Sequence, residues 1–262
     1  MFSHLRIHTE FSIVDGTCRI DDLVQAAKND GQTALAITDV NNLFATVKFY
    51  TACRKAGIKP VIGCEIALKG LNDGMELPKI ILLAKNQQGY LNLCRVLTLL
   101  WTQSADSSQA AVGWDAIESH REGLILLCGG LHGPIGQAIR SGSLEKAQEW
   151  AQTFSKAFQD HFYLEIQRAG RVEDELHNAT VLAWASQWQW PVVATHPVQF
   201  MGAEDHEAHE ARVCIASGDI LGNPKRPKRF TRMQYFLSRS EMAERFADIP
   251  SALANKIGRA HV

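Results

Sequence analysis

The chain has 262 residues, with 27 lysines and arginines against 28 aspartates and glutamates, so its formal net charge is −1. Its 46% hydrophobic and 21% charged residues are typical of a folded globular protein and exclude disorder, collagen-like sequence and a coiled coil. A charge this close to zero gives no support to a chain that grips nucleic acid along its whole length. No apolar run reaches the roughly 18 residues of a membrane span, so we expect no membrane association.

Two further features favour a cytoplasmic location. The N-terminal sequence MFSHLRIHTEF carries charged residues where a signal peptide has an apolar stretch. The six cysteines are spread singly along the chain and form no C-x-x-C pair. This spacing is typical of reduced, buried thiols rather than of disulfides or a zinc ribbon.

Seven apolar runs bounded by turn residues predict β-strands, at residues 3–9, 33–39, 59–66, 79–85, 123–129, 162–167 and 191–196. Segments of helical period separate most of them, at residues 20–29, 44–56, 88–103, 133–158 and 172–189. This alternation predicts an α/β fold with a mainly parallel sheet, as a barrel or a doubly wound layer. The length allows one barrel or two small domains.

The character of the sequence changes towards the C-terminus. Residues 203–218 predict a helix with an acidic first turn, whereas residues 222–230 (GNPKRPKRF) combine two prolines with four basic residues. The run KRPKR at 225–229 fits a contact with phosphates or with the rest of a larger protein, and it fits equally well a solvated linker. Residues 238–250 predict a short helix capped by Ser238.

Five polar residues follow or end predicted strands: His8, Asp15, Asp39, Glu65 and His196. In parallel α/β folds, ligands bind beyond the carboxyl ends of the strands. Two imidazoles and three carboxylates gathered there could hold divalent metals and support hydrolysis of a phosphate ester. The alternative is that each side chain caps a neighbouring helix or pairs with a nearby lysine or arginine.

Three early segments carry a resemblance to a known family: HTEFSIVDG (8–16), ALAITDVNNLFATVKFY (34–50) and AGIKPVIGCE (56–65). In this order and spacing they resemble the start of bacterial DNA polymerase III alpha subunits, replicative C-family polymerases that begin with a polymerase-and-histidinol-phosphatase (PHP) domain. The resemblance continues through LLAKNQQGYLNLCRVLT (82–98), FYLEIQR (162–168) and FADIPSALAN (246–255). It implies a PHP-type distorted seven-stranded β/α barrel, which agrees with the strand count above.

The sequence departs from the metal-binding pattern of that family. The substituted ligand positions are Arg6, Val40, Lys79, Gly130, Pro197 and Gln199. The ligands that the family pattern retains are His8, Asp15, Asp39 and Glu65, with His196 outside the expected register.

Two of these substitutions bring positive charge to positions that hold neutral imidazoles in the family. We expect Arg6 and Lys79 to pair with Asp39 and Glu65 and so to neutralise the pocket. A catalytic metal needs several neutral or anionic ligands, so the sequence predicts a degenerate PHP site that holds no metal.

The resemblance also implies a division of labour. It implies that the whole protein is a DNA-directed DNA polymerase, a nucleotidyltransferase whose Mg²⁺ ions, DNA and sliding clamp are held by regions outside this chain. It implies that this segment is an inactive scaffold that holds the proofreading exonuclease subunit. The alternative is a PHP-type metal-dependent phosphoesterase, against which the substitutions argue.

The expected domain limits follow from the same resemblance. We expect a PHP barrel over residues 1–220, then a linker and the start of a polymerase core over 221–256. The last six residues, IGRAHV at 257–262, can be encoded by a string that matches a common sequencing-library adapter. We therefore expect a non-native tail left by truncation, with a genuine C-terminus as the alternative.

Overall fold

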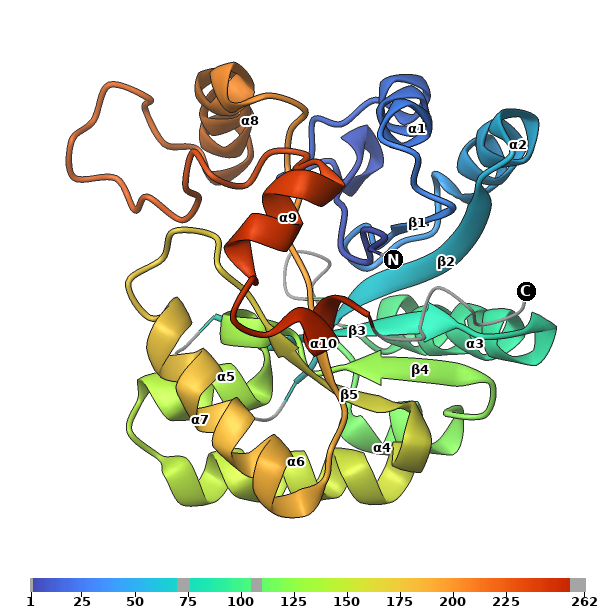
Figure 1. Cartoon of the computed structure of the whole chain (residues 1–262), viewed down its shortest axis with the longest axis vertical. Helices are drawn as coiled ribbons and strands as arrows, with labels where there is room; N and C mark the ends of the chain where they lie inside the picture. Colours follow the sequence, from blue (N-terminus) through green and yellow to red (C-terminus); the bar gives the residue numbers. More distant parts are fainter. Residues whose placement is uncertain (1, 70–75, 105–109, 255–262) are drawn as a thin grey trace.

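The computed structural model describes residues 2–69, 76–104 and 110–254, which form a curled β-sheet with helices packed around it (Figure 1). The strands are β1 (Ala34–Ile37), β2 (Lys59–Ala67), β3 (Lys79–Ala84), β4 (Leu124–Leu127), β5 (Phe162–Ile166) and β6 (Val192–Ala194). The helices are α1 (Ile20–Asn29), α2 (Thr46–Ala56), α3 (Gln87–Gln103), α4 (Trp114–Ser119), α5 (Pro134–Arg140), α6 (Leu144–Phe158), α7 (Asp174–Trp188), α8 (His206–Ser217), α9 (Arg239–Arg245) and α10 (Pro250–Leu253). The expected tail at 257–262 lies outside the described residues.

The sheet is mixed rather than parallel. Its strands follow chain order from β1 to β6, and β1 with β2, β4 with β5 and β5 with β6 pair in parallel. Strand β3 runs antiparallel to both of its neighbours. Eleven residues separate the end of β2 from the start of β3, which suits an antiparallel pair, whereas a parallel pair needs a longer crossover. The prediction of a mainly parallel sheet did not include this reversed strand.

The predicted first strand, residues 3–9, is extended chain without a regular ladder, so the described residues contain six strands instead of seven. Its backbone bonds to β1 through Ala36 N to His4 O and Thr38 N to Ile7 O, both at 2.9 Å. Three residues on one side span two on the other, which breaks the ladder as a β-bulge does. On its other side the segment forms an isolated bridge from Ile7 to Val198.

Apolar side chains fill the inside of the curled sheet: Leu5, Ala36, Val61, Ile81, Leu83, Ile125, Leu127 and Val193. They come from the N-terminal segment and from strands at both ends of the sheet order. Alternate residues of β3, Ile80 and Leu82, point to the opposite face, under the helices. A flat sheet would keep its first and last strands apart, so this shared core requires the curl.

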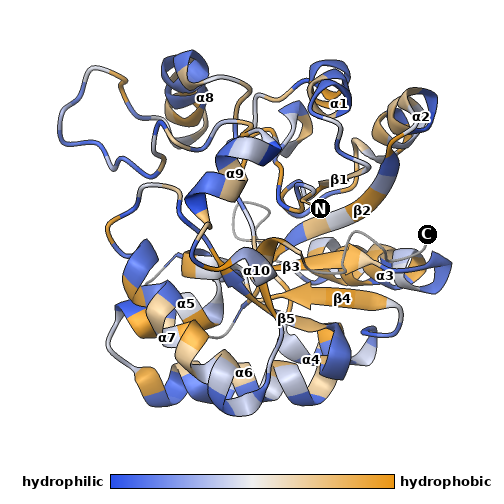
Figure 2. Cartoon of the chain, in the orientation of Figure 1, coloured by the Kyte–Doolittle hydropathy of each residue, from blue (hydrophilic) through white to orange (hydrophobic). Residues whose placement is uncertain are grey.

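Helices cover the outer face of the sheet in two groups. Figure 1 shows α1 and α2 beside β1 and β2, and α4 to α7 on the side of β4 and β5, while Figure 2 shows the apolar residues gathered on the strands. Sequence signals set several helix ends as predicted: Ser238 caps α9 in a capping box with Glu241, and Gly57 at φ +77° ends α2. Among the described residues, no helix has both the length and the apolar character to cross a membrane.

The inner core should carry much of the stability. We expect Leu83→Ala, at a fully buried position on β3, to lower the free energy of unfolding by about 2–5 kcal/mol. Val47→Ala, at an exposed position on α2, is the matched control and should change it by about 0.5 kcal/mol or less. Urea unfolding measures both, and equal losses in the two variants would contradict the assignment of the inner core.

Candidate functional site

The candidate site lies at one edge of the sheet, where the extended N-terminal segment crosses it. Alternate side chains of extended chain point to opposite sides, so Arg6 and His8 face the site while Ile7 packs into the core with α1 and α2. Glu65 comes from the second half of β2. Lys79 is the first residue of β3, and because β3 is reversed, this residue lies at the same edge as the ends of the parallel strands.

The buried Glu65 carboxylate is the centre of the site. Its Oε2 lies 3.0 Å from Arg6 Nη2 and 3.0 Å from His8 Nε2. Its Oε1 lies 3.9 Å from Lys79 Nζ, and His8 Nδ1 lies 3.0 Å from an oxygen of Asp15. We call Arg6, His8, Asp15, Glu65 and Lys79 the Glu65 cluster. When His8 is protonated, this cluster contains three cationic groups and two carboxylates.

The Arg6 guanidinium reaches beyond Glu65. Its Nη1 donates to the carbonyl of Gly129 at 3.1 Å and lies 3.8 Å from Glu165, which is fully buried near the end of β5. Glu165 also accepts from Gly129 N at 2.6 Å and from Thr195 Oγ1 at 2.7 Å. Arg6 therefore joins the N-terminal segment to β2, β5 and the turn after β4.

The expected pairing of Arg6 and Lys79 is right for Glu65 and wrong for Asp39. The Asp39 carboxylate accepts from Thr9 N at 2.7 Å and from the hydroxyls of Thr9 and Ser12. These donors belong to the turn that follows the N-terminal segment, so Asp39 closes that turn as a cap does. Burial raises the pKa of Asp39, and these hydrogen bonds offset only part of the rise.

Charge pairing sets the protonation states of the Glu65 cluster. Burial would lower the pKa of His8, but the carboxylates of Asp15 and Glu65 outweigh burial and raise it to about 10. Burial opposes ionisation of Glu65 as well, yet Arg6 and His8 hold its pKa well below the usual range. At neutral pH the cluster therefore contains a protonated imidazole that donates from both ring nitrogens.

A cavity of about 90 Å³ opens over the Glu65 cluster. Further cations and polar groups reach it from segments distant in sequence: His132, Arg171, Gln199, Arg229 and Gln234. Arg171 forms an ion pair with Asp174 at 3.0 Å, and the amide of Gln199 lies 3.2 Å from His8 Nδ1. Within the described ranges, no group of three or more histidine, cysteine, aspartate or glutamate side chains is arranged to hold a metal ion.

The other substituted positions lie around this cavity in different ways. Pro197 lines it with Gln199, whereas Val40 forms an isolated bridge with Glu65 through its backbone. Gly130 has a φ of +56°, and a Cβ there would lie 2.9 Å from the side chain of Gln167, so a larger residue would be strained.

His196 does not join the Glu65 cluster. It is fully buried beside His4, with 6.3 Å between the ring centroids, and it is absent from the cavity wall. Burial holds the pKa of His196 well below its ordinary value. The strand-end rule placed it correctly in sequence, but the chain turns its side chain into the interior.

Sequence reasoning missed several residues of the site, among them Glu165, Arg171 and His132. Glu165 had a usable signal, since it is a carboxylate inside an apolar strand and close to its carboxyl end. Arg171 lies in a loop and His132 ends a short 3-10 turn, and nothing in the local pattern indicates the side of the sheet they face.

The basic residues of the run at 225–229 lie in different surroundings. Arg226 forms an ion pair with Glu210 on α8, which fastens the loop to the fold, and Arg229 lines the cavity. Lys225 and Lys228 are exposed to solvent. The two predicted uses of the run both remain predictions.

Comparison with known proteins identifies the fold family. The sequence model of the PHP domain matches residues 4–169. This chain belongs to the PHP domain family. The DNA polymerase III alpha subunits of Vibrio cholerae and Pseudomonas aeruginosa are each 41% identical over 256 residues, and that of Escherichia coli K12 is 40% identical over 258.

These matches cover 98% of this chain and 22% of each relative, so the chain spans about a fifth of the curated relatives it matches, at their N-terminal region. Among solved structures, an amidohydrolase from Chromobacterium violaceum covers 81% of this chain and 97% of its own, with a TM-score of 0.42 and 12% identity. A two-domain protein from Bacteroides vulgatus with a PHP-like part covers 76% of this chain and 52% of its own, with a TM-score of 0.43 and 13% identity.

Removing Arg6 should strongly destabilise this PHP domain. We expect Arg6→Met to lower the free energy of unfolding by about 3–5 kcal/mol, because the buried Glu65 and Glu165 carboxyl groups would lose the cation that they share. Arg54→Met, at an exposed position on α2, is the control and should change it by about 0.5 kcal/mol or less. An equally small loss in Arg6→Met, measured by urea unfolding, would contradict the role given to Arg6.

The charge on His8 should make stability fall on the alkaline side. Its folded pKa of about 10 lies above an unfolded value of about 6.5, so its contribution is complete below pH 6.5 and is lost as pH rises towards 10. We expect the stability difference between the natural chain and His8→Gln to shrink by up to about 4 kcal/mol from pH 6 to pH 9.5. A difference that stays constant across this range, in urea unfolding, would exclude a buried imidazolium.

Proposed function

We propose that ion pairs replace the metal centre in this PHP domain and that the domain is a non-catalytic scaffold within a replicative polymerase. The observation that supports this is the position of the Arg6 guanidinium close to two buried carboxylates. It lies 3.0 Å from Glu65 and 3.8 Å from Glu165. A fixed cation in that place repels a divalent ion and already occupies the carboxylates that would bind it.

The protonation of His8 supports the same proposal. A histidine binds a metal through an unprotonated ring nitrogen, whereas both nitrogens of His8 face carboxylate oxygens at 3.0 Å. With a pKa of about 10, His8 would have to lose a well-stabilised proton before it could serve as a ligand. Lys79 adds a further positive charge beside Glu65.

The relatives supply the larger setting of this proposal. They are DNA polymerase III alpha subunits, so we infer that the whole protein synthesises DNA with Mg²⁺ ions bound in a core outside this chain. In this setting the proofreading exonuclease subunit is the partner of the PHP domain, while DNA, the sliding clamp and other holoenzyme subunits bind elsewhere. We place the protein in the cytoplasm.

Metal content and partner binding test the proposal. We expect the purified chain, after incubation with Zn²⁺ or Mn²⁺ and desalting, to retain well under one equivalent by elemental analysis. It should not hydrolyse p-nitrophenyl phosphate above the rate of an Asp15→Asn and Glu65→Gln control. It should bind the purified proofreading exonuclease subunit in calorimetry. One equivalent of retained metal together with hydrolysis would overturn the metal-free assignment, and absence of binding would overturn the scaffold role.

A metal-dependent phosphoesterase is the second candidate function. One observation favours it: His8, Asp15 and Glu65 still meet within 3.0 Å contacts at the edge where the family binds metals. A phosphoesterase would need a metal to displace Arg6 and the proton of His8. If so, retained metal and hydrolysis should both be lost in Glu65→Gln, whereas the scaffold proposal gives no metal in either protein.

A further inference from the structure

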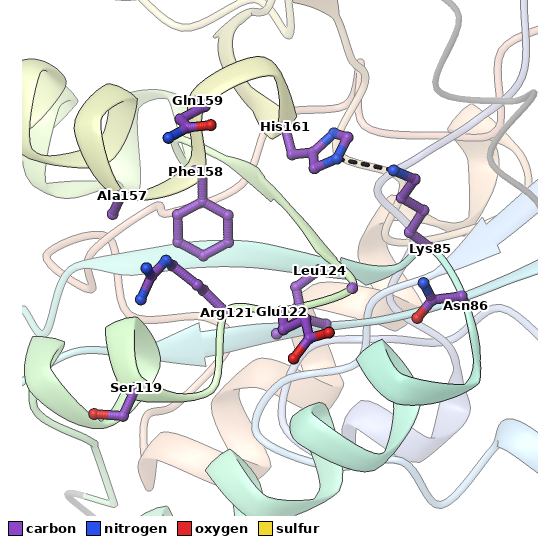
Figure 3. Close-up of a pocket in the computed structure, with 11 residues that line it drawn as sticks. Lys85, Asn86, Ser119, Arg121, Glu122, Leu124, Ala157, Phe158, Gln159 and His161 are labelled. Atoms are coloured by element: carbon purple, nitrogen blue, oxygen red, sulfur yellow. Dashed lines mark hydrogen bonds between the residues drawn. The ribbon is translucent and has the colours of Figure 1, made fainter.

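A second cavity, of about 620 Å³, opens at the opposite end of the sheet from the Glu65 cluster. Its wall comes from the turn after β3, the turn before β4 and the end of α6 with the 3-10 turn that follows (Figure 3). In the parallel strands these are the amino-terminal ends, and in the reversed strand β3 they are the carboxyl-terminal end. This volume lies in the range of small-molecule sites, about 300–1,000 Å³.

Two cations of this cavity lack a carboxylate. Lys85 Nζ donates to His161 Nε2 at 2.9 Å, and Arg121 Nη1 donates to the carbonyl of Glu118 at 2.8 Å. Among the described residues, neither Lys85 nor Arg121 has a carboxylate within 4.0 Å, in contrast to Arg6 and Lys79 in the Glu65 cluster. The lining residues include one carboxylate, Glu122, so cations outnumber anions on this wall.

In the contact between Lys85 and His161, the positive charge of one side chain disfavours a positive charge on the other. The ammonium can donate only if His161 Nε2 is unprotonated, and burial and the Lys85 charge both lower the pKa of His161. The other charged groups that face this pair are Asp160, next to His161, and Arg121 and Glu122 across the cavity. An anion placed between Lys85 and His161 would accept a hydrogen bond from Lys85, and from His161 once its Nε2 carries a proton.

The floor of the cavity is apolar and rigid. Phe158 and Leu124 are buried, and Phe158 packs against Trp114 with 6.2 Å between ring centroids. The wall beside them is fixed by a close approach: Lys85 N donates to Gly123 O at 2.8 Å, and a Cβ on Gly89 would lie 1.8 Å from that same oxygen. Figure 3 shows Phe158 between Arg121 and the Lys85 and His161 pair.

We propose that this cavity binds an organic anion, a phosphate or carboxylate group carried on an aromatic or apolar body. The anionic group lies against Lys85 and His161, and the body covers Phe158 and Leu124. This cavity shares no lining residue with the Glu65 cluster, so a failure to bind anions leaves the proposed scaffold function untouched.

Calorimetric titration and NMR of the full chain test this site with three probes: phenyl phosphate, benzoate and the neutral analogue benzyl alcohol. We expect saturable binding of at least one of the two anions and no binding of the neutral analogue. The anion that binds more tightly shows whether the site prefers a phosphate or a carboxylate group. The bound anion should raise the pKa of the His161 ring, because it offsets the charge of Lys85.

Variants separate the site from a general effect of charge. Lys85→Met should weaken anion binding by roughly tenfold or more, whereas Lys55→Met, the same change at an exposed position on α2, should leave it unchanged. His161→Gln is the second variant, in case Lys85→Met does not fold, and should also weaken binding. Absence of saturable binding by both anions, or equal weakening by Lys55→Met, would overturn the proposal.

Discussion

A single buried carboxylate, Glu65, imposes its requirements on the surrounding fold. An ionised group in an apolar interior is stable only when charges and hydrogen-bond donors surround it. Glu65 obtains Arg6 and His8, each at 3.0 Å, from a segment that is nearly sixty residues away in the chain. Those donors reach it because the N-terminal segment follows the edge of the sheet, although its bonding to β1 is too irregular to make a strand.

The inner core and the Glu65 cluster depend on each other. The apolar inner face needs the sheet to curl so that Leu5 meets Val193, and the same curl brings β2, β5 and the N-terminal segment around Arg6. Arg6 suits this place because a planar guanidinium presents several donors in fixed directions. It contacts Glu65, Glu165 and the Gly129 carbonyl together, which a lysine could not do.

Local signals predicted most elements, and tertiary contacts decided the rest. The helix at 20–29 and the strand at 59–66 match α1 and β2 closely, because their apolar periodicity and end residues are local properties. The reversal of β3 is set by its pairing with β2 and β4, because an apolar run has the same pattern whichever way the strand runs. Likewise the partners of Asp39 are the donors of a turn whose fold no spacing rule describes.

The two ends of the sheet treat positive charge differently, and burial explains why. At the Glu65 end Arg6 and His8 are almost fully enclosed, so a carboxylate must accompany them or their burial would be too costly. At the other end Lys85 and Arg121 stand partly or fully in water, which screens them and removes that requirement. Charge without a fixed partner is therefore stable only where solvent, or a ligand that displaces it, can reach the side chain. The fold thus pairs the cations that it buries beside Glu65 and leaves Lys85 and Arg121 without a carboxylate at the open cavity.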